Sequence, residues 1–213
     1  VSIICFNRSH LYLIITIIKY QICFCKSIMW KRLSQFLLLC GICILIKPLY
    51  FYTKGYLAQV LLDNAWNKTV KTQSPQLAWP WAKTYPVGKL YFPKLDESFT
   101  ILDGTTTEAL AFGPGHVEGT SYPGENGNIC IAGHRDSFFN NIKDLSFGDI
   151  IRIDYVDSQQ LFQVDSTIVV EPEETRWLDA TGSTQLTLIT CYPFYYVGEA
   201  PQRYIVRAGL IGP

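Results

Sequence analysis

The sequence has no excess of charge of either sign. Its 213 residues carry 18 Lys and Arg against 18 Asp and Glu, so the formal net charge is zero. This balance argues against a nucleic-acid-binding protein that works through a broad positive field, because such a field needs a basic excess. It also argues against a disordered chain, because 48% of the residues are hydrophobic and only 17% are charged.

Cysteine is scarce behind the first 62 residues. The chain has seven cysteines, of which only Cys130 and Cys191 lie behind this apolar front. Two cysteines cannot build a disulfide framework, and these two do not have the CxxC spacing of a zinc site. Each of them therefore needs its own explanation.

Long apolar runs are confined to the front of the chain. Residues 11–25 form one run, broken by Lys19, and residues 36–52 form a second, broken by Lys47 and Pro48. Neither is a clean run of the roughly 20 apolar residues that a bilayer requires. A buried core helix is therefore an alternative for the second run.

A short basic leader stands before the second run. Met29 is followed by Trp30, Lys31 and Arg32, and no small-residue cleavage site follows the apolar run. We predict an uncleaved signal anchor over residues 29–53, with the basic side inside and the domain outside. Residues 1–28 are then either an extra hydrophobic leader or a stretch that is not part of the native protein.

A stalk and a linker are expected behind the anchor. Leu57, Val60, Leu61 and Ala65 recur with a helical period, which predicts an amphipathic helix. Pro and Ser after this helix mark a break in the chain. We therefore assign residues 54–84 to the stalk and linker and residues 85–213 to a domain.

The domain is expected to be a small closed β-barrel. Several of its segments alternate with period two, as Ile151 and Ile153 do against Arg152 and Asp154. Short strands with Gly- and Pro-rich turns predict a mainly β fold, with a short helix at residues 138–145. The expected strands cover residues 89–95, 98–102, 128–132, 149–156, 160–170, 185–190 and 202–208.

Three residues suited to thiol chemistry lie at or near strand ends. Cys191 ends an apolar strand, His134 follows another, and Arg203 lies on the strand behind the cysteine. The histidine can act as acid to a leaving amine and as base to a nucleophile, while an arginine favours a thiolate and faces an oxyanion. Taken singly, each has a structural alternative: a buried free cysteine, a surface histidine in a turn, and a surface arginine in an ion pair.

Together these residues lie in motifs that resemble those of the sortase family of cysteine transpeptidases. Residues 187–193 are Thr-Leu-Ile-Thr-Cys-Tyr-Pro, which contains the family's TLxTC pattern, and residues 131–135 are Ile-Ala-Gly-His-Arg. The resemblance covers about residues 85–211 and the anchor. With the stalk and Trp79-Pro-Trp81, the chain looks most like the marine proteobacterial type of Gram-negative cells. Further matching segments are residues 113–116, 123–130 and 145–149.

The resemblance implies an eight-stranded sortase β-barrel with short helices behind an N-terminal membrane anchor helix. Cys191 is then the nucleophile, His134 the acid and base, and Arg203 the partner of the oxyanion or of a substrate carbonyl. Thr190 is expected to orient the substrate or to contribute to the oxyanion site. Four more residues are expected to bind substrate near the same groove: His116, Glu118, Thr120 and Ser121.

The implied function is a membrane-anchored transpeptidase that cleaves an LPxTG-like sorting signal between Thr and Gly. A thioacyl intermediate on the cysteine is passed to an amine. The expected partners are a secreted protein with a C-terminal sorting signal, an amine acceptor and the membrane, with no nucleic acid. No cofactor or metal is expected, since no acidic cluster demands calcium. The domain is expected on the periplasmic or extracytoplasmic side of the inner membrane, behind one or two membrane segments.

Two other functions stay open, together with the role of one cysteine. The chain could be a cysteine peptidase, in which water resolves the same thioester, or a non-catalytic surface assembly or adhesion module. The papain-type Cys-Gly-Ser-Cys-Trp pattern is absent, as is the Ser-His-Gly-Cys pattern of L,D-transpeptidases. Cys130 is either a small core residue or the partner of Cys191 in an inactivating disulfide.

Overall fold

The computed structural model describes residues 8–212, with side chains for residues 19, 30–50 and 53–212. Residues 1–7 of the expected leader lie outside the described residues. The chain divides into two units, Val1–Lys54 and Gly55–Pro213. Helix α1 (Arg8–Thr72) occupies most of the first unit and continues into the second, with Pro48 inside it.

One stretch of α1 is long and apolar enough to cross a membrane, by length and composition. Among the described residues this stretch is Trp30–Thr72; an 18-residue window within it has a mean hydropathy of 1.9, and none of that window is buried within the protein. It contains nearly all of the anchor predicted at residues 29–53. Leu38 and Ile44 are 64% and 73% exposed, so residues 36–50, of which the structure describes the side chains, are not the buried core helix that the sequence left open.

The last turns of α1 belong to the second unit and pack on its strands. Leu62 contacts a small apolar cluster with Leu102 and Ala109. The Asp63 carboxylate accepts hydrogen bonds from Lys89 Nζ at 3.2 Å and from Thr100 Oγ1 at 2.9 Å. The base of the helix is therefore fixed by both apolar and charged contacts.

The buried face of this helix differs from the predicted one. Leu57 and Val60 were expected on the apolar face but are exposed, and of the four predicted residues only Ala65 is buried. The buried face of the helix consists of three small side chains together with one leucine and one tryptophan. The buried residues are Ala58, Leu62, Ala65, Trp66 and Thr69.

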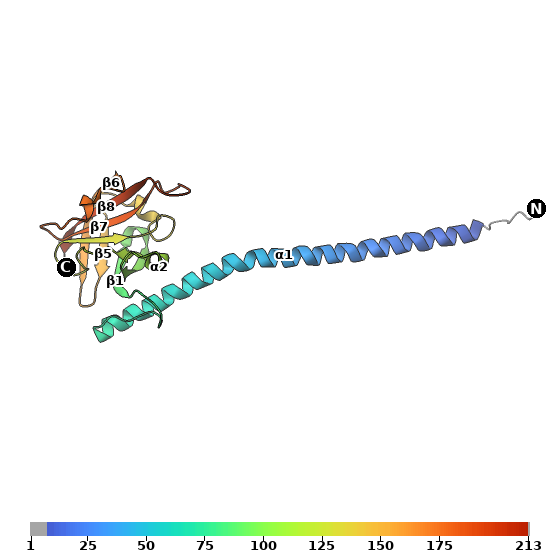
Figure 1. Cartoon of the computed structure of the whole chain (residues 1–213), viewed down its shortest axis with the longest axis horizontal. Helices are drawn as coiled ribbons and strands as arrows, with labels where there is room; N and C mark the ends of the chain where they lie inside the picture. The colour runs from blue at the N-terminus through green and yellow to red at the C-terminus, as the bar shows by residue number, and fades with distance from the viewer. Residues whose placement is uncertain (1–7, 213) are drawn as a thin grey trace, which may run out of the picture. The chain divides into compact units, whose positions relative to one another are not determined.

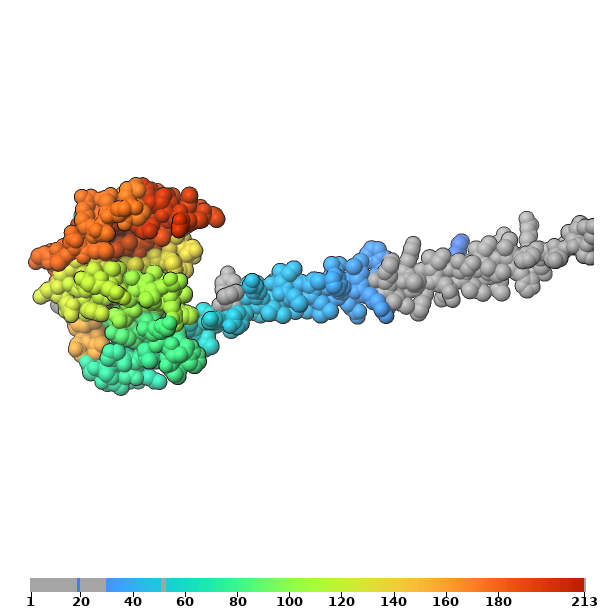
Figure 2. Space-filling view, in the orientation of Figure 1, coloured from blue at the N-terminus to red at the C-terminus, as the bar shows by residue number. Residues whose placement is uncertain are grey.

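Eight strands close into a barrel in the order β1-β2-β3-β4-β7-β8-β6-β5 (Figure 1). The predicted mainly β, closed eight-stranded barrel with short helices is confirmed. In the space-filling view of Figure 2, red and orange C-terminal residues cover the top of the face, with yellow-green and then green residues below them. The strands are β1 (Pro86–Phe92), β2 (Glu97–Asp103), β3 (Gly115–His116), β4 (Asn128–Ala132), β5 (Ile150–Asp154), β6 (Gln159–Val170), β7 (Gln185–Tyr192) and β8 (Gln202–Gly212).

Most strands lie where the alternating sequence pattern predicts them. Most of the short elements had no such pattern and were not predicted. The two-residue strand β3 was not expected, nor were helix α2 (Thr107–Phe112) and the 3-10 turn η3 (Thr175–Leu178). The helix predicted at residues 138–145 is a single 3-10 turn, η2 (Asn141–Asp144). A further turn, η1 (Pro93–Leu95), joins β1 to β2.

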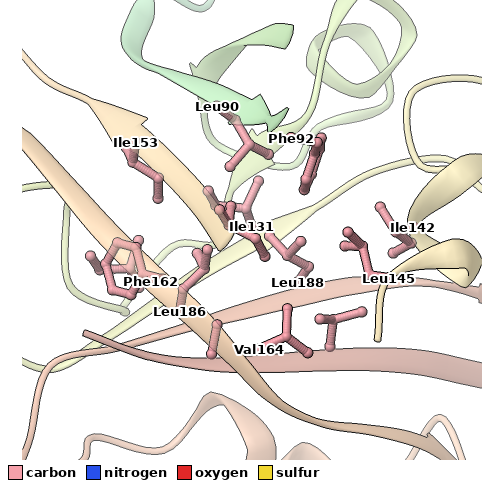
Figure 3. Packing of buried hydrophobic residues seen from close by; sticks show 14 of the residues in the cluster. Leu90, Phe92, Ile131, Ile142, Leu145, Ile153, Phe162, Val164, Leu186 and Leu188 are labelled. Carbon is pink, nitrogen blue, oxygen red and sulfur yellow. The ribbon is translucent and has the colours of Figure 1, made fainter. Parts of the chain in front are cut away.

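The barrel interior is filled by side chains from every long strand, which point toward one another in Figure 3. On β4 and β7 the inward residues are Ile129 and Ile131, and Leu186 and Leu188, all fully buried. Successive residues of a strand point to opposite faces, so the residues between these four lie on the outer face. This alternation decides which way Thr190 and Cys191 point.

Candidate active site

The candidate site forms where two parallel strands end together. β4 and β7 are parallel neighbours, with Ala132 paired to Ile189. Parallel strands present their carboxyl ends at the same edge of a sheet. His134, just behind β4, and Cys191, near the end of β7, are therefore brought to one edge.

The third residue arrives from the strand on the other side of β7. β8 runs antiparallel to β7, and Cys191 is directly paired with Arg203. Side chains that are directly opposite in an antiparallel pair share one face of the sheet. The expectation that the returning strand brings the arginine beside the cysteine is therefore met by the register.

An open pocket of about 460 Å³ contains all three side chains. Cys191 is partly buried and His134 is exposed, so the thiol and the imidazole are both accessible. Arg203 is held by its Nη1, which donates to the carbonyls of Ala200 at 3.2 Å and Gln202 at 3.0 Å. The pocket is lined by His134, Arg135, Asp136, Cys191, Gly198, Glu199, Ala200 and Arg203.

The turn that carries His134 is fixed by the barrel core. The His134 carbonyl accepts the backbone N–H of Phe139 at 3.0 Å. The Phe139 ring lies so close to Gly133 that a Cβ there would meet it at 2.7 Å. A glycine is therefore required before His134, because any side chain would displace the ring or the turn.

Thr190 points into the barrel end rather than into the pocket. It has the same parity on β7 as the buried Leu188, and it is only 2% exposed. Its Oγ1 donates to the Gly133 carbonyl at 2.7 Å. This hydrogen bond ties the cysteine strand to the histidine turn, and a role of Thr190 in orienting the substrate or in the oxyanion site stays a prediction.

The four other expected substrate residues are not among those that line the pocket. His116 is 1% exposed, its Nε2 lies 2.9 Å from the Ser121 carbonyl, and its ring stacks on Tyr122. Thr120 Oγ1 lies 3.2 Å from the same Nε2. His116 ends β3 and is paired with Ile131 of β4, whereas Glu118, Thr120 and Ser121 lie in the connection that leads into the start of β4.

Cys130 is fully buried and is far from the candidate nucleophile. It is paired with Thr187, and Cys191 lies four residues further along β7. At about 3.3 Å per residue the two cysteines are separated by roughly 13 Å along the strand. A disulfide requires Cα atoms within about 7 Å, so the Cys130–Cys191 bond that the sequence left open does not form in this fold.

Several residues that line the pocket were not predicted from the sequence. Arg135 directly follows His134 in the matched motif, so its position alone was a usable signal. Gly198, Glu199 and Ala200 come from the connection between β7 and β8, for which the sequence has no strand or helix pattern. Among the described residues no group of three or more His, Cys, Asp or Glu side chains could hold a metal ion.

Residues 90–211 match the Sortase domain family. The chain belongs to the sortase family. It is 37% identical over 120 residues to sortase D of Bacillus subtilis. The aligned region covers 56% of this chain and 61% of that protein. Sortases are cysteine transpeptidases, and the predicted family is thereby confirmed.

Solved sortase structures have the same barrel. A sortase D5 transpeptidase from Clostridium perfringens has a TM-score of 0.61 at 26% identity, covering 74% of this chain and 99% of that one. Sortase A from Corynebacterium diphtheriae has a TM-score of 0.57 at 31% identity, covering 62% and 64%. Both likenesses therefore extend over well more than half of the chain.

The two cysteines of the barrel should differ sharply in reactivity. Burial raises the pKa of Cys130 to about 12, so this thiol is protonated near pH 8. Because only the thiolate is alkylated, iodoacetamide at about pH 8 should modify Cys191 and spare Cys130 in the folded full-length protein. Peptide mapping by mass spectrometry measures this, with the urea-unfolded protein as the control in which both react. Equal labelling of both cysteines in the folded protein would contradict the assignment.

Proposed function

We propose that the protein is a membrane-anchored transpeptidase that cleaves an LPxTG-like sorting signal between Thr and Gly and transfers the product to an amine. The observation that carries the proposal is that Cys191, His134 and Arg203 line one accessible pocket. Nucleophile, acid–base group and fixed cation are the parts that acyl transfer through a thioester needs. Membership of the sortase family supports the same chemistry.

The reaction has two halves that share one covalent intermediate. In the first, the Cys191 thiolate attacks the Thr carbonyl carbon, and the C–N bond to Gly breaks as His134 protonates the leaving amine. In the second, an amine attacks the thioester carbonyl and gives a proton to His134. The C–S bond then breaks and the thiolate is restored.

Arg203 stabilises the oxygen that becomes negative in both halves. Its backbone is paired with that of Cys191, and two carbonyls hold Nη1. A donor fixed before the reaction begins stabilises the developing charge without reorganisation. Thr190 acts indirectly, because its hydroxyl holds the Gly133 carbonyl next to His134.

The proposed location is the inner membrane, with the barrel on the periplasmic or extracytoplasmic side. The apolar stretch in α1 supports an anchor, and Lys31 and Arg32 before it favour a cytoplasmic N-terminal side. The proposed partners are a secreted protein with a C-terminal LPxTG-like signal and an amine acceptor. The marine proteobacterial subgroup stays a prediction that rests on the stalk and on Trp79-Pro-Trp81.

Product masses separate transfer from hydrolysis. The full-length protein in detergent is mixed with an LPxTG-type peptide, with and without added triglycine. We expect cleavage after Thr, and a peptide–triglycine conjugate when the amine is present. Cys191→Ala should abolish both products, while Cys130→Ser should keep most of the activity because that thiol is outside the pocket. Hydrolysis that added amine leaves unchanged would indicate a peptidase, and no Cys191-dependent cleavage would overturn the proposal.

Arg203→Lys should lose acylation rate by roughly 100-fold, the scale of one oxyanion donor. Lys keeps the charge but lacks the planar fork of donors. Because the interaction strengthens in the transition state, peptide affinity should change little. Single-turnover acylation and iodoacetamide labelling of Cys191 are measured side by side. Acylation at the wild-type rate, or an equal loss in both reactions, would contradict the oxyanion role.

A further inference from the structure

We propose that Arg135 is a positioning residue that latches the connection between β7 and β8 (residues 193–201, here the β7–β8 loop) over the pocket and so protects the thioacyl intermediate from water. The inference rests on the proposed function. The Arg135 side chain lines the pocket, and its guanidinium donates hydrogen bonds to backbone carbonyls of the β7–β8 loop on the opposite wall. The latch decides how the intermediate is resolved rather than whether it forms.

Arg135 joins the turn that carries His134 to the β7–β8 loop, which connects the strands of Cys191 and Arg203. It directly follows His134, and its Nη2 donates to the carbonyls of Tyr196 at 2.7 Å and Gly198 at 3.0 Å. The guanidinium also lies 5.7 Å from the centroid of the Tyr196 ring. One side chain therefore spans from the histidine turn to the middle of the β7–β8 loop.

The middle of the β7–β8 loop has little else to hold it. Tyr195 and Val197 are 86% and 97% exposed, so they pack against almost nothing. Among the described residues, both hydrogen bonds from the rest of the unit to residues 195–199 come from Arg135. Lys143 Nζ also lies 5.0 Å from the centroid of the Tyr195 ring.

The same segment supplies one wall of the pocket. Gly198, Glu199 and Ala200 line it together with Cys191. If the β7–β8 loop is released, this wall moves and water reaches the thioester more readily. Water then adds to the thioester carbonyl and passes a proton to His134, the C–S bond breaks, and the products are a carboxylic acid and the free thiolate.

The geometry calls for an arginine rather than any cation. A guanidinium can donate to two carbonyls from one nitrogen while its plane lies over an aromatic ring. A lysine ammonium in its place would keep the charge near Cys191 without holding this arrangement. Arg135→Lys therefore separates a latch from an electrostatic effect on the thiol.

The experiment compares the full-length protein with Arg135→Gln, Arg135→Lys and the control Arg152→Gln. Arg152 pairs with Asp154 on β5 and lies 4.0 Å from the Tyr91 ring, so its loss removes a similar set of contacts away from the pocket. The readouts are the ratio of hydrolysis to transfer with an LPxTG-type peptide and triglycine, the single-turnover acylation rate, and hydrogen exchange of residues 193–201.

Both Arg135 variants should raise the hydrolysis-to-transfer ratio by about tenfold or more, the scale of losing charge-assisted hydrogen bonds. The acylation rate should change by a smaller factor than this ratio, and exchange of residues 193–201 should accelerate. Arg152→Gln should change neither the ratio nor the exchange.

A wild-type ratio in Arg135→Lys, or unchanged exchange of residues 193–201 in both Arg135 variants, would overturn the latch. An equal loss of acylation and transfer in Arg135→Gln and Arg152→Gln would overturn it as well, because that pattern indicates general destabilisation. If the wild-type protein forms no acyl-enzyme, the proposed function fails. The exchange measurement then still decides whether Arg135 holds the β7–β8 loop.

Discussion

The pairing of β7 with a parallel neighbour on one side and an antiparallel neighbour on the other is the constraint on which the site depends. The parallel partner β4 delivers His134 to the edge where β7 ends. The antiparallel partner β8 returns past the same point and places Arg203 opposite Cys191. Strand pairing thus positions Cys191 and Arg203, and His134 lies in a turn directly behind its strand, which is the rigid support that a catalytic arrangement needs.

The alternation along β7 gives two adjacent residues different roles. Cys191 faces the pocket, and Thr190 faces the barrel interior, where it bonds the carbonyl that precedes His134. The adjacent residues Thr190 and Cys191 therefore connect the barrel core directly to the pocket. Arg135 makes a second link from the same histidine turn, across the pocket to the β7–β8 loop. The histidine turn is held both from the barrel interior and from the opposite wall.

The sequence was most informative where local pattern and motif agree. The long strands follow from period-two alternation, and Cys191, His134 and Arg203 follow from a motif whose spacing reflects strand register. Contacts chosen by tertiary packing were not predictable. The stalk helix buries Ala58 rather than Leu57, because a close approach to the barrel favours small side chains. Thr120 and Ser121 are near His134 in the sequence, yet their loop leads into the opposite end of β4.

The proposed mechanism requires a thioester between Cys191 and a sorting signal. Intact-mass spectrometry of the full-length protein, quenched in acid shortly after mixing with an LPxTG-type peptide, tests it directly. We expect an adduct with the mass of the acyl fragment that ends in Thr, mapped by digestion to Cys191 and released by hydroxylamine. An adduct on Cys130, or cleavage of the peptide without any adduct on Cys191, would contradict it.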